Sequence, residues 1–331
     1  MLDSDVKINL RLKTESNLPS VELSSDSLME LDSIYTKYDY FEPTLNPKLF
    51  NLESLSKDAF NFRQNYLEQN IGYIIIKNFW NPKYSIEQAK NGLLIFSQLF
   101  GKVIQQNATG LLVKEVKDRS KSYTNDSTSR YSESKYGGNY HTDGAEIPPP
   151  LPDFLTLVCI RKSKSGGEFK ILNANEIHNA LLEKHPESIT RLHKNFIWDR
   201  RGDLGPNGEE TFEKPIFSYS TAAHALTLGT DFYTDQNNTL TCEYLRQYID
   251  DGYKKSETIQ TQEDIDALNS MDSVLYDDSL AQTILLEPGE ILISTNSHTL
   301  HGRTNFTDFI NEDGSPDPKK QRILLRTWII K

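Results

Sequence analysis

The sequence predicts a mainly β protein with flanking helices, an α+β chain built on a double-sheet jelly roll. Beyond residue 110 the apolar residues fall in short runs of strand length, and turn residues such as Gly166-Gly167 and Pro288-Gly289 separate the runs. Helical periodicity is confined to a few segments. No internal repeat or domain-sized linker is visible. We therefore expect a single domain over residues 51–331, with residues 1–50 as an appendage packed on it.

The expected elements begin with a helix, a strand and a second helix. Residues 52–69 carry apolar side chains at helical spacing, and Gly72 ends the pattern before a strand over 73–77. The second helix covers 85–100. Helical insertions are expected at about 175–185 and 240–280, although the acidic stretch within the second one, 254–278, indicates a surface excursion. Further strands are expected over 111–116, 154–161, 169–172, 196–199, 216–219, 225–230, 283–286, 290–294, 301–306 and 323–330.

Composition argues against several classes of partner. The net charge of −11 would repel phosphate backbones and anionic lipid surfaces, so we expect neither nucleic acid nor a membrane as partner. The first residues lack the basic start and apolar run of a secretory signal. Only two cysteines are present, and Cys159 lies in an apolar segment, which favours a reducing cytoplasm. The oligomeric state is not indicated.

Two histidines and a carboxylate form the most informative motif. In His141-Thr142-Asp143 the outer residues are two apart, which on a strand places both on one face. A distant histidine on a neighbouring strand would complete the facial triad that holds iron(II) in non-haem oxygenases. His301 and His298 compete for this role, and His301 is preferred because Gly302 follows it. The other histidines, His178, His185, His193 and His224, lie in helical or surface patterns and are not expected to be ligands.

Two arginines near the C-terminus are the second motif. Arg322 and Arg326 lie four apart in an apolar strand, so period 2 places both on one face. A buried arginine is costly unless it is paired. Its planar fork suits a carboxylate, so an oxoacid cosubstrate is a natural partner. The alternative for each arginine is an internal salt bridge to an acidic residue or exposure at a sheet edge.

Taken together, these motifs resemble the iron(II)/2-oxoglutarate dioxygenases of the taurine dioxygenase (TauD/TfdA) and clavaminate synthase-like group. The resemblance runs from about residue 72 to the C-terminus. It implies a distorted jelly roll, the double-stranded β-helix of cupin-like proteins, with His141, Asp143 and His301 as iron ligands. It also implies that Arg322 binds the distal carboxylate of 2-oxoglutarate and that Arg326 meets an acidic group of the substrate.

One departure concerns the Gly-Gly turn. Relatives commonly place a threonine or serine after it to assist the cosubstrate, whereas here Glu168-Phe169 follows Gly166-Gly167. We expect Thr156 or Thr327 to supply the hydroxyl, or the cosubstrate to depend more on Arg322. The remaining candidates for substrate binding, beside Arg326, are polar or aromatic residues close to the motifs: Asn107, Tyr140 and Glu146.

The expected activity is oxygenation of an unactivated C–H bond. Fe(II), 2-oxoglutarate and O2 would act together, with release of succinate and CO2. Because Asp143 is present where halogenating relatives have a small residue, hydroxylation is favoured, and desaturation or cyclisation is open to the same site. The substrate is expected to be a small polar molecule bearing a carboxylate, such as an amino acid or its derivative. Two alternatives are a jelly-roll metal-binding or regulatory protein without oxygenase activity and a zinc-dependent cupin-like hydrolase.

Overall fold

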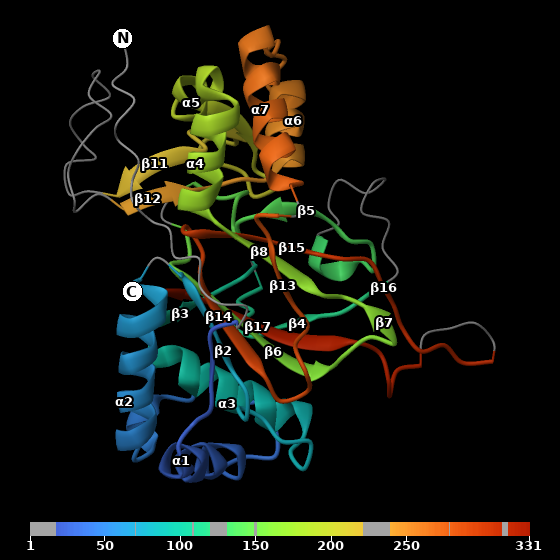
Figure 1. Cartoon of the computed structure of the whole chain (residues 1–331). Coiled ribbons are helices and arrows are strands. Elements are labelled where there is room, and N and C mark those ends of the chain that lie inside the picture. Colours follow the sequence, from blue (N-terminus) through green and yellow to red (C-terminus); the bar gives the residue numbers. More distant parts are fainter. Residues whose placement is uncertain are drawn as a thin grey trace.

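Two β-sheets form the centre of the molecule (Figure 1). The computed structural model describes residues 18–69, 71–107, 109–119, 131–148, 151–220, 239–277, 279–312 and 317–331. The seven-stranded sheet has the order β1 (Ser20–Val21), β2 (Tyr73–Ile76), β14 (Ile291–Thr295), β6 (Phe154–Arg161), β17 (Ile323–Ile330) and β3 (Lys102–Ile104), and β4 (Lys114–Val116) also pairs with β17. The four-stranded sheet has the order β13 (Gln282–Ile284), β8 (Phe169–Asn173), β15 (Thr299–Arg303) and β5 (Gly138–His141).

Three helices cover the outer face of the seven-stranded sheet: α1 (Ser25–Tyr35), α2 (Glu53–Phe62) and α3 (Ile86–Gln98) (Figure 1). Alternation along β17 explains this packing, because Ile323, Leu325 and Ile329 point into the core shared with the helices. The described part of the N-terminal segment joins the same core through Leu31 and Ile34 of α1. The boundary between an appendage and a domain at residue 50 stays a prediction.

A second apolar cluster fills the space between the two sheets. It combines Leu324 and Trp328 of β17 and Leu157 of β6 with Phe169 and Ile171 of the four-stranded sheet. Even-numbered residues of β17 therefore face the interior and odd-numbered residues face α3. Arg326 is even-numbered and faces the interior, and Arg322, directly before β17, packs against Phe169 of the same interior cluster, so the two arginines share a face.

A helical lobe covers the outer face of the four-stranded sheet (Figure 1). It contains α4 (Ala174–Lys184), α5 (Pro186–Leu192), α6 (Arg246–Lys255) and α7 (Gln262–Leu275), with the strand pairs β9 (Phe196–Asp199) with β10 (Thr211–Lys214) and β11 (Phe217–Ser220) with β12 (Thr239–Cys242). The expectation of a surface excursion over 254–278 is wrong for α7. Glu263 and Asp266 of this helix are exposed, but Asp264 is buried and pairs with Arg191, and Leu268 and Met271 are fully buried in the lobe.

Other expected elements differ in their bounds. The strand expected over 301–306 is divided into β15 and β16 (Phe306–Thr307), which pairs with β7 (Ser165–Gly166). The helix expected over 52–69 continues beyond α2 as a π-helical turn, Arg63–Leu67, and short 3-10 turns occur at Pro47–Leu49 and Tyr131–Glu133. The strand expected over 225–230 lies outside the described residues. Among the described helices, none has both the length and the apolar character needed to span a membrane.

Replacing Gly92 with alanine is expected to destabilise the fold. Gly92 lies in α3, and a Cβ there would be 2.1 Å from the ring of Tyr35, whose hydroxyl donates to the carbonyl of Phe79 at 2.6 Å. Overpacking of this kind costs about 1–3 kcal/mol. A lower urea midpoint would show the effect, and Glu87→Ala in the same helix is the matched control. An unchanged midpoint in Gly92→Ala would contradict the expected clash.

Candidate metal centre

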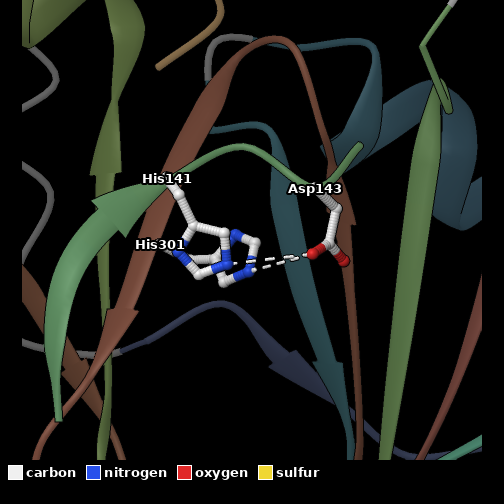
Figure 2. Close-up of side chains that lie close together, drawn as sticks. All are labelled: His141, Asp143 and His301. Carbon is white, nitrogen blue, oxygen red and sulfur yellow. Dashed lines mark ion pairs between the residues drawn. The ribbon is translucent and has the colours of Figure 1, made fainter. Parts of the chain in front are cut away.

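The three predicted ligands come together at one end of the interior (Figure 2). His301 of β15 lies opposite His141 of β5 in the register of the four-stranded sheet, so the two imidazoles are adjacent, with ring centroids 4.3 Å apart. The Asp143 Oδ1 atom lies 3.8 Å from Nε2 of His141 and 4.0 Å from Nε2 of His301. One ligand atom from each residue lies within 4.8 Å of the others. These donors fit a single metal ion.

The remaining histidines of the described residues lie elsewhere. His298 occupies the turn before β15 and donates its backbone N–H to Thr295. His178 and His193 pair with each other in the helical lobe, with Nε2 atoms 3.2 Å apart. His185 contacts Ser273, and His224 lies outside the described residues.

Hydrogen bonds hold the ligand segment from both sides. The backbone N–H of Asp143 donates to Oδ1 of Asn296 at 2.8 Å, and the side-chain amide of Asn296 donates back to the carbonyl of Asp143 at 2.9 Å. Thr142, between the two ligands, donates its backbone N–H to the carbonyl of Tyr244. These hydrogen bonds fix the backbone of Thr142 and Asp143. They thereby limit the directions in which the side chains of His141 and Asp143 can point.

The Asp143 carboxylate is bound by two donors from β17. Trp328 Nε1 donates to Oδ2 at 2.9 Å, and Arg326 Nη1 donates to Oδ1 at 2.8 Å. Burial opposes ionisation of this carboxyl, but the Arg326 charge and the neighbouring imidazoles of His301 and His141 outweigh it and hold the pKa of Asp143 at about 2. An ionised carboxylate is the form that a metal ligand needs.

Burial sets the protonation of both histidines. It lowers the pKa of His301 to about 3, helped by the neighbouring imidazole of His141, and it also lowers the pKa of His141, although the Asp143 carboxylate opposes this. Neutral imidazoles offer a lone pair to a cation. The site therefore presents two neutral nitrogens and one anionic oxygen at neutral pH.

Arg326 is held by a residue that the sequence did not single out. Its Nε donates to Oε1 of Gln106 at 2.8 Å, and Nε2 of Gln106 donates to the carbonyl of Arg326 at 2.8 Å. Gln106 is buried between two exposed neighbours, Gln105 and Asn107. Three consecutive polar residues give no local signal that the middle one is buried, so only the tertiary structure identifies it.

Arg322 directly precedes β17, and four residues at the usual rise per residue of a strand place it about 13 Å from Arg326. Its guanidinium packs against Phe306 and Phe169, 5.0 and 5.7 Å from the ring centroids. A Cβ on Gly167 would approach Nε of Arg322 to 3.1 Å, so the Gly-Gly turn allows close contact with this arginine. A small cavity of about 10 Å³ borders Arg322 and Leu324.

The structure contradicts the expectation for Thr156 and Thr327. Their hydroxyls lie 2.7 Å apart, and that of Thr327 is 2.7 Å from the hydroxyl of Ser97 in α3. Thr327 follows Arg326 directly and so faces the other side of the sheet, and Thr156 is its partner in register. At the Gly-Gly turn itself, the hydroxyl of Thr304 accepts a hydrogen bond from the backbone of Gly167.

Two of the four expected substrate residues lie away from the triad. Asn107 is exposed, and its side-chain oxygen accepts hydrogen bonds from Thr109 and Leu111 within a turn. Tyr140 packs into the helical lobe, 5.7 Å from the ring of Tyr276, because it alternates with His141 on β5. Substrate binding by Asn107 and Tyr140 therefore stays a prediction that these contacts do not support.

Glu146 and Arg326 lie near the triad. Arg326 contacts Asp143 directly. The carboxylate of Glu146 is buried and lies close enough to His141 to favour the protonated form of its imidazole.

Trp328→Phe is expected to weaken metal binding by about 10- to 100-fold. The change keeps an aromatic ring in the interior but removes the indole N–H that donates to Oδ2 of Asp143, so the carboxylate loses this support for its orientation. Anaerobic titration with Fe(II) or Co(II) measures the affinity. Trp80→Phe, at a buried indole in the helix-side core, is the matched control. Equal affinities for the two variants would rule out an orienting role for Trp328.

Acidification is expected to destabilise the metal-free protein from about pH 6.5 downward. Burial lowers the pKa of His178 and His193 to about 4 and that of His301 to about 3. Because these values lie below the ordinary histidine pKa, the unfolded chain binds protons that the folded chain does not. The stabilisation is present at neutral pH and lost as pH falls. Urea midpoints measured across this range should decrease, and His193→Phe should make the dependence shallower; a constant midpoint would contradict this.

Comparison with known proteins identifies the family. Residues 37–328 match the profile of the taurine catabolism dioxygenase TauD, TfdA family. The chain belongs to this family. It is therefore a dioxygenase that acts on a small-molecule substrate, in agreement with the oxygenase interpretation and against the zinc hydrolase and the non-enzymatic binding protein.

Two relatives with similar sequences agree with this assignment. The TauD-family chain is 26% identical over 264 residues to FR-33289 synthase of Streptomyces rubellomurinus, covering 80% of this chain and 70% of the relative. It is 28% identical over 188 residues to a uridine-5'-phosphate dioxygenase of a Streptomyces species, covering 57% of this chain and 60% of that one.

Solved structures share the fold. An asparagine oxygenase in complex with Fe(II), 3-hydroxyasparagine and succinate has a TM-score of 0.63 at 17% identity, covering 94% of this chain and 93% of that chain. The non-haem iron oxygenase OrfP in complex with iron and α-ketoglutaric acid has a TM-score of 0.62 at 16% identity, covering 95% and 94%.

Proposed function

We propose that this protein is an iron(II)- and 2-oxoglutarate-dependent hydroxylase of a small polar molecule that bears an acidic group, such as an amino acid or its derivative. The reaction releases succinate and CO2. The observation that carries the proposal is the convergence of His141, Asp143 and His301 beside a wall of β17 that also carries Arg322 and Arg326. The two facing sheets form the distorted jelly roll, or double-stranded β-helix, of this family.

In this proposal the three ligands hold Fe(II) through Nε2 of both histidines and Oδ1 of Asp143. The donor set fits iron because it combines two neutral imidazoles with one carboxylate. The bound iron supplies the activation of O2 that a protein side chain cannot perform. Trp328 donates to Oδ2, the carboxylate oxygen other than the one nearest to the imidazoles, and so orients the Asp143 side chain. The presence of Asp143 as a ligand favours hydroxylation over halogenation.

Separate arginines are proposed to bind the cosubstrate and the substrate. Arg322 is proposed to bind the distal carboxylate of 2-oxoglutarate, because it is a buried cation on the inner face between aromatic rings. Arg326, held by Gln106, is proposed to bind the acidic group of the substrate next to the iron. Glu146 remains a candidate for a further substrate contact.

The substrate class has two candidates. A free or derivatised amino acid is favoured by the fold shared with an asparagine oxygenase. A phosphorylated substrate is favoured by the relative named uridine-5'-phosphate dioxygenase, since an arginine fork binds phosphate as well as carboxylate. Two further predictions belong to the proposal. The protein is expected in the cytoplasm, and residues 51–331 are expected to form one catalytic domain.

Substrate-triggered succinate release tests the function. The purified protein is given Fe(II) and 2-oxoglutarate without oxygen, and an absorption band is expected from the complex. Free L-amino acids, their amides and uridine 5'-phosphate are then screened with oxygen for stimulated succinate release. His141→Ala, Asp143→Ala and His301→Ala should each abolish both signals. Undiminished turnover in all three variants would overturn the assignment of the ligands.

A further inference from the structure

Three segments that are far apart in the sequence meet beside the metal ligands. The first is residues 142–143, the second is residues 296–297 in the turn before β15, and the third is residues 242–244, in which β12 ends. Each segment is hydrogen-bonded to both of the others. We refer to this arrangement as the junction.

The contact between the first and third segments is reciprocal. The backbone N–H of Thr142 donates to the carbonyl of Tyr244 at 3.0 Å, and the backbone N–H of Tyr244 donates to the hydroxyl oxygen of Thr142 at 3.2 Å. Both residues are 1% exposed. One of these two hydrogen bonds therefore depends on a side chain, the hydroxyl of Thr142, which lies between the ligands His141 and Asp143 in the sequence.

Two further contacts close the junction. Asp143 and Asn296 exchange two hydrogen bonds, at 2.8 and 2.9 Å. The backbone N–H of Cys242 donates to the carbonyl of Ser297 at 2.8 Å, and Ser297 lies in the turn that leads to β15 and its ligand, His301. The third segment therefore contacts both parts of the chain that carry metal ligands.

Tyr244 belongs to the helical lobe. Its side chain lies in the apolar cluster of the lobe, and its hydroxyl donates to Oδ1 of Asp272 in α7 at 2.5 Å. Nη1 of Arg246, at the start of α6, donates to the other oxygen of this carboxylate at 2.8 Å. The residue that holds Thr142 is thus itself held by two helices of the lobe.

The position of Asp143 depends on these contacts because Asp143 lies outside the strands. β5 ends at His141, and Asp143 lies in the turn that follows (Figure 2). The hydrogen bonds of the sheet therefore do not fix this ligand, and those of the junction do. Without the Thr142 hydroxyl, the buried N–H of Tyr244 would lose its acceptor, which is costly, and the ligand turn would keep one of its two hydrogen bonds to Tyr244.

We propose that Thr142 is a positioning residue of the metal centre: its hydroxyl joins the turn that carries Asp143 to the helical lobe, so that the geometry of the ligands depends on the packing of this lobe. The inference rests on the proposed function and extends it to a residue between two ligands. By thermodynamic linkage, metal binding stabilises the junction in return.

Thr142→Val tests this role, because it keeps the shape of the side chain and removes the acceptor. Anaerobic titration with Co(II) measures the affinity, and the visible absorption spectrum of bound Co(II) reports the ligand geometry. We expect about 10-fold weaker binding and an altered spectrum, with both restored in Thr142→Ser, which keeps the hydroxyl. Thr156→Val is the matched control, since its buried hydroxyl bonds to Thr327 away from the triad. Equal losses in the two valine variants, or no loss in Thr142→Val, would overturn the proposal.

Hydrogen exchange tests the junction without metal. In the metal-free protein, Thr142→Val should speed the exchange of the amides of Asp143 and Cys242, whose acceptors both lie in the second segment, whereas Thr156→Val should leave them unchanged. Co(II) should slow both amides in the wild type. The proposal is overturned if both amides stay as protected in Thr142→Val as in the wild type. Failure of the wild type to bind Co(II) would instead overturn the proposed function, and exchange in the metal-free protein would still decide on the junction.

Discussion

We expect the Asp143→Ala variant to lose metal binding and catalytic turnover together. Changing a residue that only orients a metal ligand costs about 10- to 100-fold, so removing a ligand is expected to cost more than about 100-fold in affinity. The substitution also removes the acceptor for Arg326 and Trp328, both of which are buried. A buried arginine without its carboxylate is strongly destabilising. We therefore expect a lower urea midpoint in addition to the loss of activity.

Asp143→Asn separates these two effects. The amide keeps the shape of the side chain and can still accept a hydrogen bond through its oxygen, but it lacks the negative charge that Fe(II) and Arg326 need. It should bind metal poorly while retaining more stability than the alanine variant. Metal titration, succinate release and urea unfolding on the same preparations give the three readouts. Wild-type metal affinity in Asp143→Ala would show that the metal binds elsewhere.

Arg326→Met is expected to destabilise the protein by about 3–5 kcal/mol, because it leaves the buried Asp143 carboxylate without its cationic partner. In the folded protein this arginine makes three interactions, with Asp143, with Gln106 and with the face of Trp328, whose ring centroid is 4.7 Å away. The methionine fills much of the same volume, so lost electrostatics rather than a cavity would account for the change. Binding of acidic substrates should be lost as well.

A double-mutant cycle tests the origin of this effect. If the pair dominates, Asp143→Asn combined with Arg326→Met should be more stable than the sum of the single changes predicts. Arg326→Lys keeps the positive charge but not the planar guanidinium group. It should recover part of the stability and little of the binding of acidic substrates. Strict additivity of the two single changes would show that the ion pair does not couple the residues.

The local pattern of apolar residues was sufficient to predict several elements of the fold. The strands expected over 154–161 and 323–330 coincide with β6 and β17, and the helix expected over 85–100 contains α3. Each is a long run whose periodicity is unambiguous. The acidic composition of residues 254–278 did not indicate that α7 is packed against the lobe. The apolar residues of α7 contact α4 and α5, which are distant in the sequence.

The residue types of the motif were sufficient to predict the chemistry of the metal site, because two histidines and an aspartate define which metals can bind. The expected strand was wrong at one point: β5 ends at His141 and Asp143 lies in the turn that follows, so strand alternation does not place the aspartate. The pairing of β5 with β15 brings the other histidine, His301, opposite His141. The glycine after His301 favoured it over His298 as the third ligand, but the sequence could not show this contact.

The other residues around the triad could be identified only from the folded chain. Trp328 and Arg326 contact Asp143 and Gln106 contacts Arg326, whereas the interactions given for Asn107, Tyr140, Thr156 and Thr327 are with other parts of the molecule. The physical reason is that a side chain's direction follows from strand alternation, which is local, but its neighbours follow from register between strands that are distant in the chain. Composition carries no record of that register, so the contacts of Asp143 with Arg326 and Trp328 became visible only when β17 was placed beside the turn that carries Asp143.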